Sequence, residues 1–145
     1  MVRGHLVAIF VGAFMFCGRS ASACECVGWP TSEYLRGADV VYTGRVVSIR
    51  EGPRFAWPEI EFGLDRTIKG RTDGKRFVLV TPGANGVNCR GFDFVVGKEY
   101  VVFARARDSE TLLPGTYGVS WCAGTASLET DEGKVRLRET LRLSR

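Results

Sequence analysis

The stretch Ala21-Ser22-Ala23-Cys24-Glu25-Cys26 constrains this chain more than any other, because a run of small residues leads directly into a C-x-C pair. An Ala-x-Ala arrangement is typical of the site at which a signal peptide is removed. The apolar run over residues 6–16 fits the core of a signal peptide and is too short to span a membrane. We therefore expect residues 1–23 to be a signal peptide, and Cys24 to begin a secreted or periplasmic mature protein.

A lipoprotein signal is the alternative interpretation of the same stretch. Such signals usually carry leucine three residues before the cysteine, where this chain has Ala21. Lipidation would also consume the Cys24 sulfur and leave an odd number of cysteines. The pattern therefore favours a simple cut after Ala23.

The mature chain, residues 24–145, keeps four cysteines: Cys24, Cys26, Cys89 and Cys122. This length suffices for one domain with a hydrophobic core, and four cysteines in a small exported domain indicate two disulfides. A ring closed between Cys24 and Cys26 would be strained, so we expect each of them to pair with one of the two distant cysteines. No free thiol would then remain.

Residues that commonly carry catalysis are missing. The single histidine, His5, lies in the predicted signal peptide, which excludes Ser-His-Asp and Cys-His catalysis and His-based metal sites in the mature protein. Removal of Arg3 and Arg19 lowers the formal net charge from +4 to +2, too mild a charge to indicate nucleic acid or an anionic membrane. We therefore expect a non-enzymatic protein with no cofactor and no nucleic-acid partner. A reversible C-x-C dithiol is the enzymatic alternative, but no His or Lys lies beside Cys24 to activate it.

The residue pattern after the cysteines predicts one short helix and then strands. The helix can begin at Thr31 or Ser32, run to Arg36 and end at Gly37. Strands are predicted over 40–50, 59–69, 75–81 and 98–107, and Tyr117, Val119 and Trp121 alternate into Cys122. Gly44 inside the first strand indicates a bulge or sharp coil, as a small closed barrel needs, or is an ordinary flexible glycine.

The tail allows two interpretations. Val135, Leu137, Leu141 and Leu143 alternate with arginines, which predicts a strand whose charges protect an exposed sheet edge. Leu137 and Leu141 also fit one face of a helix; we favour the strand. Five or six short strands without a βαβ rhythm predict an all-β domain with a short helix, folded as an antiparallel barrel or sandwich.

Several stretches occur together in a recognisable order. They are the signal ending before C-x-C, the short helix, and residues 38–46, 67–70, 88–91, 97–104 and 121–125. This combination resembles the inhibitory domain of the tissue inhibitors of metalloproteinases, and more closely the bacterial proteins that share its netrin-like fold. The resemblance spans nearly the whole mature chain. It implies a five-stranded antiparallel OB-type Greek-key barrel, with disulfides Cys24–Cys89 and Cys26–Cys122 stapling the amino-terminal segment to its surface.

The resemblance also implies a function for Cys24-Glu25-Cys26, which we call the amino-terminal wedge. In the animal inhibitors, the α-amine and carbonyl of the terminal cysteine chelate the catalytic zinc of the target protease. Carried over, Cys24 would chelate the zinc of a partner metalloprotease, the only metal expected. Glu25 would enter the protease's primary specificity pocket, where the family places a small or hydroxylated residue. We expect a monomer. The alternative is a non-inhibitory extracellular binding or structural module, in which the C-x-C forms structural disulfides alone.

Overall fold

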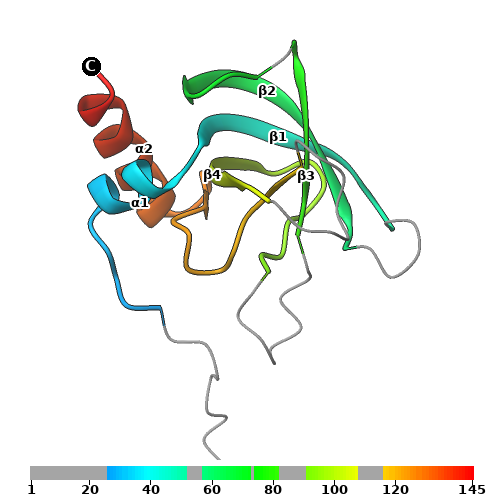
Figure 1. The fold of residues 1–145 in the computed structure, drawn as a ribbon, viewed down its shortest axis with the longest axis horizontal. Coiled ribbons are helices and arrows are strands. Elements are labelled where there is room, and N and C mark those ends of the chain that lie inside the picture. Colours follow the sequence, from blue (N-terminus) through cyan, green and yellow to red (C-terminus); the bar gives the residue numbers. More distant parts are fainter. Residues whose placement is uncertain (1–25, 52–56, 73, 82–90, 108–115) are drawn as a thin grey trace, which may run out of the picture.

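The computed structural model describes residues 26–51, 57–72, 74–81, 91–107 and 116–145. These residues form, in chain order, α1 (Thr31–Gly37), β1 (Val40–Arg50), β2 (Glu59–Lys69), β3 (Arg76–Val80), β4 (Glu99–Ala106), β5 (Tyr117–Gly118), β6 (Ala126–Ser127) and α2 (Asp131–Leu143). Figure 1 shows a strongly curved sheet with α1 and α2 side by side along one side of it. The chain is therefore mostly β, as the sequence predicts, and has one more helix than expected.

The sheet is antiparallel and nearly closes on itself. Neighbouring strands follow the order β3-β2-β1-β4-β5, and β6 pairs with β4. The two ends of this order meet just beyond β3 and β5, where the Thr81 hydroxyl donates to the Val119 carbonyl oxygen at 3.3 Å. Within the described residues, five strands thus form a barrel-like sheet, and the short β6 lies beside β4, paired at Tyr100 and Val101.

Strand β1 contributes to two separate cores. Val40, Tyr42 and Val46 are buried inside the barrel, whereas Val41 is buried on the opposite face, toward the helices. The barrel core contains Val40, Tyr42, Val46, Ile60, Phe62, Phe77, Leu79, Phe94, Tyr100, Val102, Ala104 and Val119. The helix-side core contains Tyr34, Ala38, Val41, Val101, Phe103 and Ala126, with Leu35, Ile68, Leu128 and Leu137 packed against them. Helices and barrel are therefore joined through alternate residues of the same strands.

Most of the predicted elements are confirmed. The bounds of β1 and β2 agree with the prediction, while β3 and β4 are each shorter by one residue at both ends. The alternating stretch that begins at Tyr117 is a strand over only two residues. Gly44 marks an irregularity, because the pairing with β2 shifts register between Thr43 and Gly44. A Cβ at Gly44 would lie 2.8 Å from the Gly63 carbonyl oxygen, so close approach of the two backbones requires glycine there.

The tail forms a helix, so the prediction of a strand over 135–143 is wrong. Thr130 is the N-cap of α2, and its hydroxyl accepts a hydrogen bond from the Gly133 amide at 3.1 Å. Asp131 and Glu132 in the first turn favour the positive end of the helix dipole. Gly133 and Thr140 are buried, whereas Val135 is 43% exposed. This burial follows the period of a helix, which the leucines fit as well as they fit a strand.

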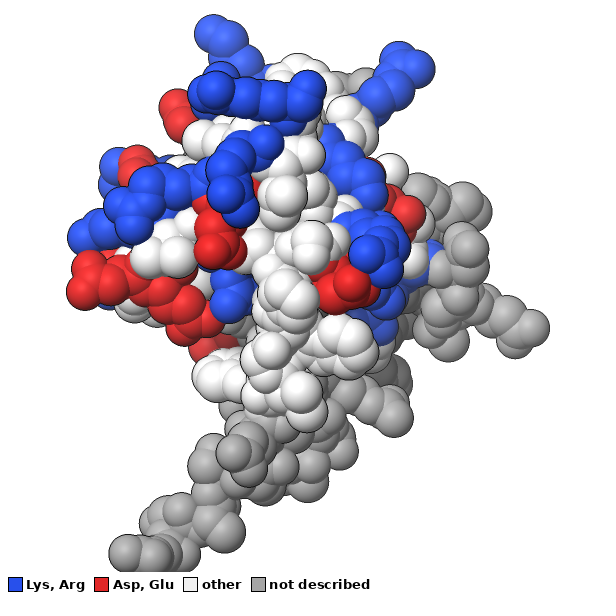
Figure 2. Space-filling model, turned by 90° about the vertical axis from the view of Figure 1, so that its left-hand side faces the viewer, with Lys and Arg blue, Asp and Glu red and all other residues white. Residues whose placement is uncertain are grey.

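The arginines of the tail lie on this helix and not on a sheet edge, which overturns their interpretation as edge protection. Arg138, Arg142 and Arg145 are exposed. Figure 2, which views the molecule from the side that carries α1 and α2, shows Lys and Arg side chains over the upper part of this face and a group of Asp and Glu lower down. Arg138 and Arg142 therefore lie on the solvent-exposed side of α2.

Replacement of Gly133 by alanine tests how α2 sits on the barrel. A Cβ at this position would collide with the Ser127 carbonyl oxygen, so we expect G133A to lower the free energy of unfolding by about 1–3 kcal/mol, measured by urea denaturation. The control V135A, on the exposed face of the same helix, should change it by less than about 0.5 kcal/mol. Helix propensity alone would make G133A more stable by about 1 kcal/mol, and that outcome would contradict this packing.

Candidate functional site

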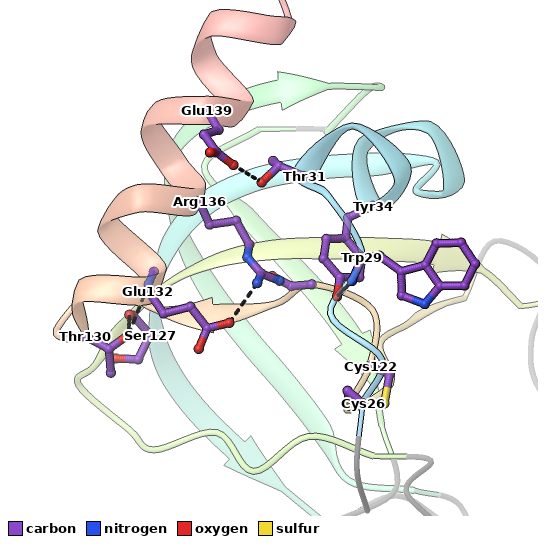
Figure 3. Close-up of polar contacts among 12 residues, drawn as sticks. Cys26, Trp29, Thr31, Tyr34, Cys122, Ser127, Thr130, Glu132, Arg136 and Glu139 are labelled. Atoms are coloured by element: carbon purple, nitrogen blue, oxygen red, sulfur yellow. Dashed lines mark hydrogen bonds and ion pairs between the residues drawn. A yellow bond between two sulfur atoms is a disulfide. The ribbon is translucent and has the colours of Figure 1, made fainter.

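A disulfide joins Cys26 to Cys122 and fixes the start of the described chain to the barrel (Figure 3). The two Cα atoms lie 5.3 Å apart, although 96 positions separate the residues in the sequence. Cys26 precedes α1, and Cys122 follows β5. This is the partner that the family resemblance implies for Cys26. The last residue of the amino-terminal wedge is therefore anchored next to the end of β5.

The extended segment after Cys26 is held again at Trp29. The Trp29 amide donates to the Tyr34 hydroxyl oxygen at 3.2 Å. The Tyr34 ring packs against Phe103, with the ring centroids 6.1 Å apart, and against Gly124, where a Cβ would lie 2.5 Å from the ring. Tyr34 thus ties the segment before α1 to the helix-side core.

Arg136 of α2 lies over the Tyr34 ring. Its guanidinium carbon lies 4.6 Å from the ring centroid, a cation–π contact. The same guanidinium donates to the Gly124 carbonyl oxygen at 3.0 Å and to the Glu132 carboxylate at 2.7 Å. These bonds fix the guanidinium over the ring, as Figure 3 shows.

A second contact joins the helices nearer the carboxyl end of α2. The Thr31 hydroxyl donates to the Glu139 carboxylate, so Thr31, proposed as a helix cap, instead bonds α2, and Pro30 is the N-cap of α1. Neither Tyr34 nor Arg136 stands out in the sequence, because the groups they contact come from the opposite end of the domain. If the tail had been predicted as a helix with Arg136 on its buried side, Arg136 and Tyr34 could have been identified.

Large apolar side chains are exposed around the disulfide. Val27 and Trp29 are 76% and 55% exposed, and Trp121, the neighbour of Cys122, is 42% exposed. All three lie within three positions of a disulfide cysteine, so the bond brings them to one end of the domain. We call Val27, Trp29 and Trp121 the apolar rim. Gathered apolar side chains of this kind mark surfaces that contact other proteins.

The remaining predicted site residues, Cys24, Glu25 and Cys89, lie outside the described residues. Among residues 26–51, 57–72, 74–81, 91–107 and 116–145, no group of three or more His, Cys, Asp or Glu side chains is arranged to hold a metal ion. Over the same ranges, no helix has the length and apolar character needed to cross a membrane.

No family model and no curated protein matches the chain. A function for this chain is therefore inferred from its own residues and their geometry.

Removal of the disulfide tests its contribution to stability. The double variant C26S/C122S opens a loop of 96 positions, and we expect a loss of about 4 kcal/mol in the free energy of unfolding by the chain-entropy model. Urea denaturation of parent and variant under non-reducing conditions measures this. A loss below about 1 kcal/mol would show that other contacts hold the segment without the bond.

A pair of tyrosine variants tests the hydrogen bond at Trp29 against an unpaired hydroxyl. The Tyr42 hydroxyl is buried in the barrel core and makes no hydrogen bond within the described part of the chain, and burial raises the Tyr42 pKa well above its usual value. We expect Y42F to leave the stability unchanged or raise it by about 1 kcal/mol. By contrast, Y34F removes the acceptor of the Trp29 amide and should lower it by about 1 kcal/mol. Thermal or urea unfolding distinguishes the two; equal losses would contradict the assignment.

Proposed function

We propose that the mature chain is an exported, non-enzymatic inhibitor of a zinc metalloprotease, built on an OB-type, netrin-like barrel and acting through the amino-terminal wedge. One observation supports it most directly: the Cys26–Cys122 disulfide anchors the chain two residues after the predicted Cys24 terminus, beside an exposed apolar rim. Anchoring of Cys26 would limit how far the proposed Cys24 terminus can move from the barrel. The described residues are compatible with a protein that works by binding.

Zinc chelation by Cys24 is chemically sound. A neutral α-amine and the carbonyl of the same residue form a five-membered chelate, which can occupy the open coordination position of a catalytic zinc. The α-amine has an ordinary pKa of about 7.7–8.0, so a useful neutral fraction exists near neutral pH. Anchoring at Cys26 restricts the wedge before binding, which lowers the entropic cost of association. The second proposed disulfide, Cys24–Cys89, would restrict it further.

Glu25 sets the class of target. A carboxylate buried in an apolar specificity pocket costs several kcal/mol unless a cation accompanies it. We therefore propose a protease whose primary pocket carries Lys or Arg, in place of the animal matrix proteases, whose pocket is apolar. The apolar rim would provide the surrounding contact, with Trp29 and Trp121 as the residue type that dominates binding energy in protein interfaces.

The decisive experiment compares the mature protein, with Cys24 first, against the same protein carrying one additional alanine before Cys24. Both are assayed on a panel of zinc metalloproteases that includes enzymes with a basic primary pocket. The added residue removes the free amine from Cys24 and leaves the barrel intact. We therefore expect inhibition to weaken at least about a hundredfold, because the zinc chelate is lost. Inhibition by the mature protein should also strengthen from pH 6 to pH 8, by about tenfold per unit below the amine pKa, because only the neutral amine binds zinc.

Equal inhibition by both proteins would contradict chelation and leave a wedge that binds by other contacts. Absence of inhibition across the panel would contradict the proposed function and leave the alternative, an extracellular binding module stapled by its cysteines. Amino-terminal sequencing of the exported protein decides the premise, since a first residue other than Cys24, or a lipid on its sulfur, removes the chelating group.

A further inference from the structure

A second candidate binding site lies beside the apolar rim. It is a cleft of about 600 Å³ between α1 and the end of the barrel at which β4 and β5 pair. Its lining includes Trp29, Arg36, Gly37, Arg105, Val119 and Cys122. Trp29 belongs to both the cleft and the apolar rim, so the two surfaces are continuous.

Gly37 leaves the space that the Arg105 side chain occupies in this cleft. The Arg105 guanidinium lies so close to the Gly37 Cα that a Cβ there would collide with it. Gly37 has no positive φ, so the space it leaves, rather than its backbone conformation, is what the contact uses. The last residue of α1 thereby leaves room for the guanidinium of a residue on β4.

Carbonyl groups at the end of α1 bond a different cation, not Arg105. They accept from Lys69, whose Nζ lies 2.8 Å from the Leu35 oxygen and 2.6 Å from the Ala38 oxygen. No hydrogen bond or ion pair of the Arg105 guanidinium occurs among the described residues. A guanidinium carries five N–H donors in a planar fork that matches a carboxylate. The cleft therefore presents an exposed cation whose donors are open to a ligand.

The remaining charges of the cleft do not cancel this cation. Glu33, the acid among its lining residues, is paired with Arg36 at 2.9 Å. Arg107 also lines the cleft, with its guanidinium carbon 5.0 Å from the Trp57 ring. The floor is apolar, with Phe103, Ala38 and Val119 buried beneath it. A net positive rim over an apolar floor complements a ligand that carries both a carboxylate and an apolar group.

We propose that this cleft binds an acidic, extended peptide segment of a partner protein, with a Glu or Asp carboxylate on Arg105 and a neighbouring apolar side chain against Trp29. A peptide is the occupant because the cleft continues into the apolar rim, a surface suited to protein contact, and because its volume exceeds what a lone carboxylate fills. The inference goes beyond the proposed function, since it requires no free amine at Cys24 and no zinc.

The test uses the alanine-extended chain, so that zinc chelation cannot contribute. Two capped pentapeptides, acetyl-Gly-Phe-Glu-Phe-Gly-amide and its Gln analogue, are titrated while the Trp29 indole and the arginine side-chain signals are followed by NMR. We expect the Glu peptide to shift the Trp29 and Arg105 signals and to bind about tenfold more tightly than the Gln peptide, the effect of one charge-assisted bidentate contact.

Three variants test whether the Arg105 guanidinium causes the tighter binding of the Glu peptide. R105Q should weaken binding of the Glu peptide about tenfold, while R138Q, the same charge change on exposed α2, should leave it unchanged. G37A keeps every charge but displaces the Arg105 side chain, and should weaken binding as R105Q does. The displaced group is the flexible end of a side chain, so we expect this variant to fold, as its amide spectrum will show.

Three results would overturn the proposal: equal binding of the Glu and Gln peptides, equal losses in R105Q and R138Q, or no saturable shift at millimolar peptide. Inorganic phosphate titrated alone separates an anion site from a peptide site. If phosphate reproduced the shifts at the same concentration as the peptide, the cleft would be a small-anion site and the peptide assignment would be wrong. Failure here leaves the inhibition experiment unaffected, because inhibition is proposed to depend on the free Cys24 amine, which peptide binding to the alanine-extended chain does not use.

Discussion

Burial of β1 on both faces is the constraint on which the rest of the domain depends. Val41 and Tyr42 are adjacent in sequence and both fully buried, one toward the helices and one inside the barrel. Because side chains alternate across a strand, a shift of one residue in the pairing would exchange the two cores. The shift at Gly44, where β1 and β2 approach too closely for a side chain, fixes the register at one point. The barrel and the helix layer are therefore specified together.

The helix layer depends on this register in turn. Val41, Val101 and Phe103 form the surface on which Tyr34 of α1 and Leu137 of α2 pack. Lys69, at the end of β2, completes the arrangement by donating to the carbonyl groups at the end of α1. The cleft beside Arg105 lies between α1 and the end of β4, so its shape depends on how α1 is held.

Local sequence patterns predict the part of the fold that local residues determine. The bounds of β1 and β2 follow from runs of apolar and β-branched residues with turn residues around them, and α1 ends at Gly37 as expected. The tail differs because its alternation of leucine and arginine fits two periods equally well. What decides for a helix is the Thr130 cap together with packing on a core formed by distant strands. The residues of that core lie elsewhere in the sequence, so no local pattern within the tail reveals them.

The candidate site divides in the same way. Four cysteines allow three connectivities, and strain in a Cys24–Cys26 ring leaves two. The pairing of Cys26 with Cys122 followed only from the family resemblance. The Tyr34–Arg136 contact and the Arg105 cleft could not be predicted, because both require the tail to be a helix or α1 to lie against β4. A tail interpreted as an edge strand assigns its arginines to edge protection and leaves none to contact Tyr34.

The helical tail connects the two ends of the mature chain. Arg136 lies over the Tyr34 ring, the Tyr34 hydroxyl accepts from the Trp29 amide, and three positions earlier Cys26 is bonded to Cys122. Each contact restricts the next, so the direction in which the amino-terminal segment leaves the barrel depends partly on the last helix. A chain that stopped before α2 would keep the disulfide but expose the Tyr34 ring and the helix-side core. The position of the segment after Cys26 and the formation of the cleft are thus consequences of one packing arrangement, with α2 as its outer layer.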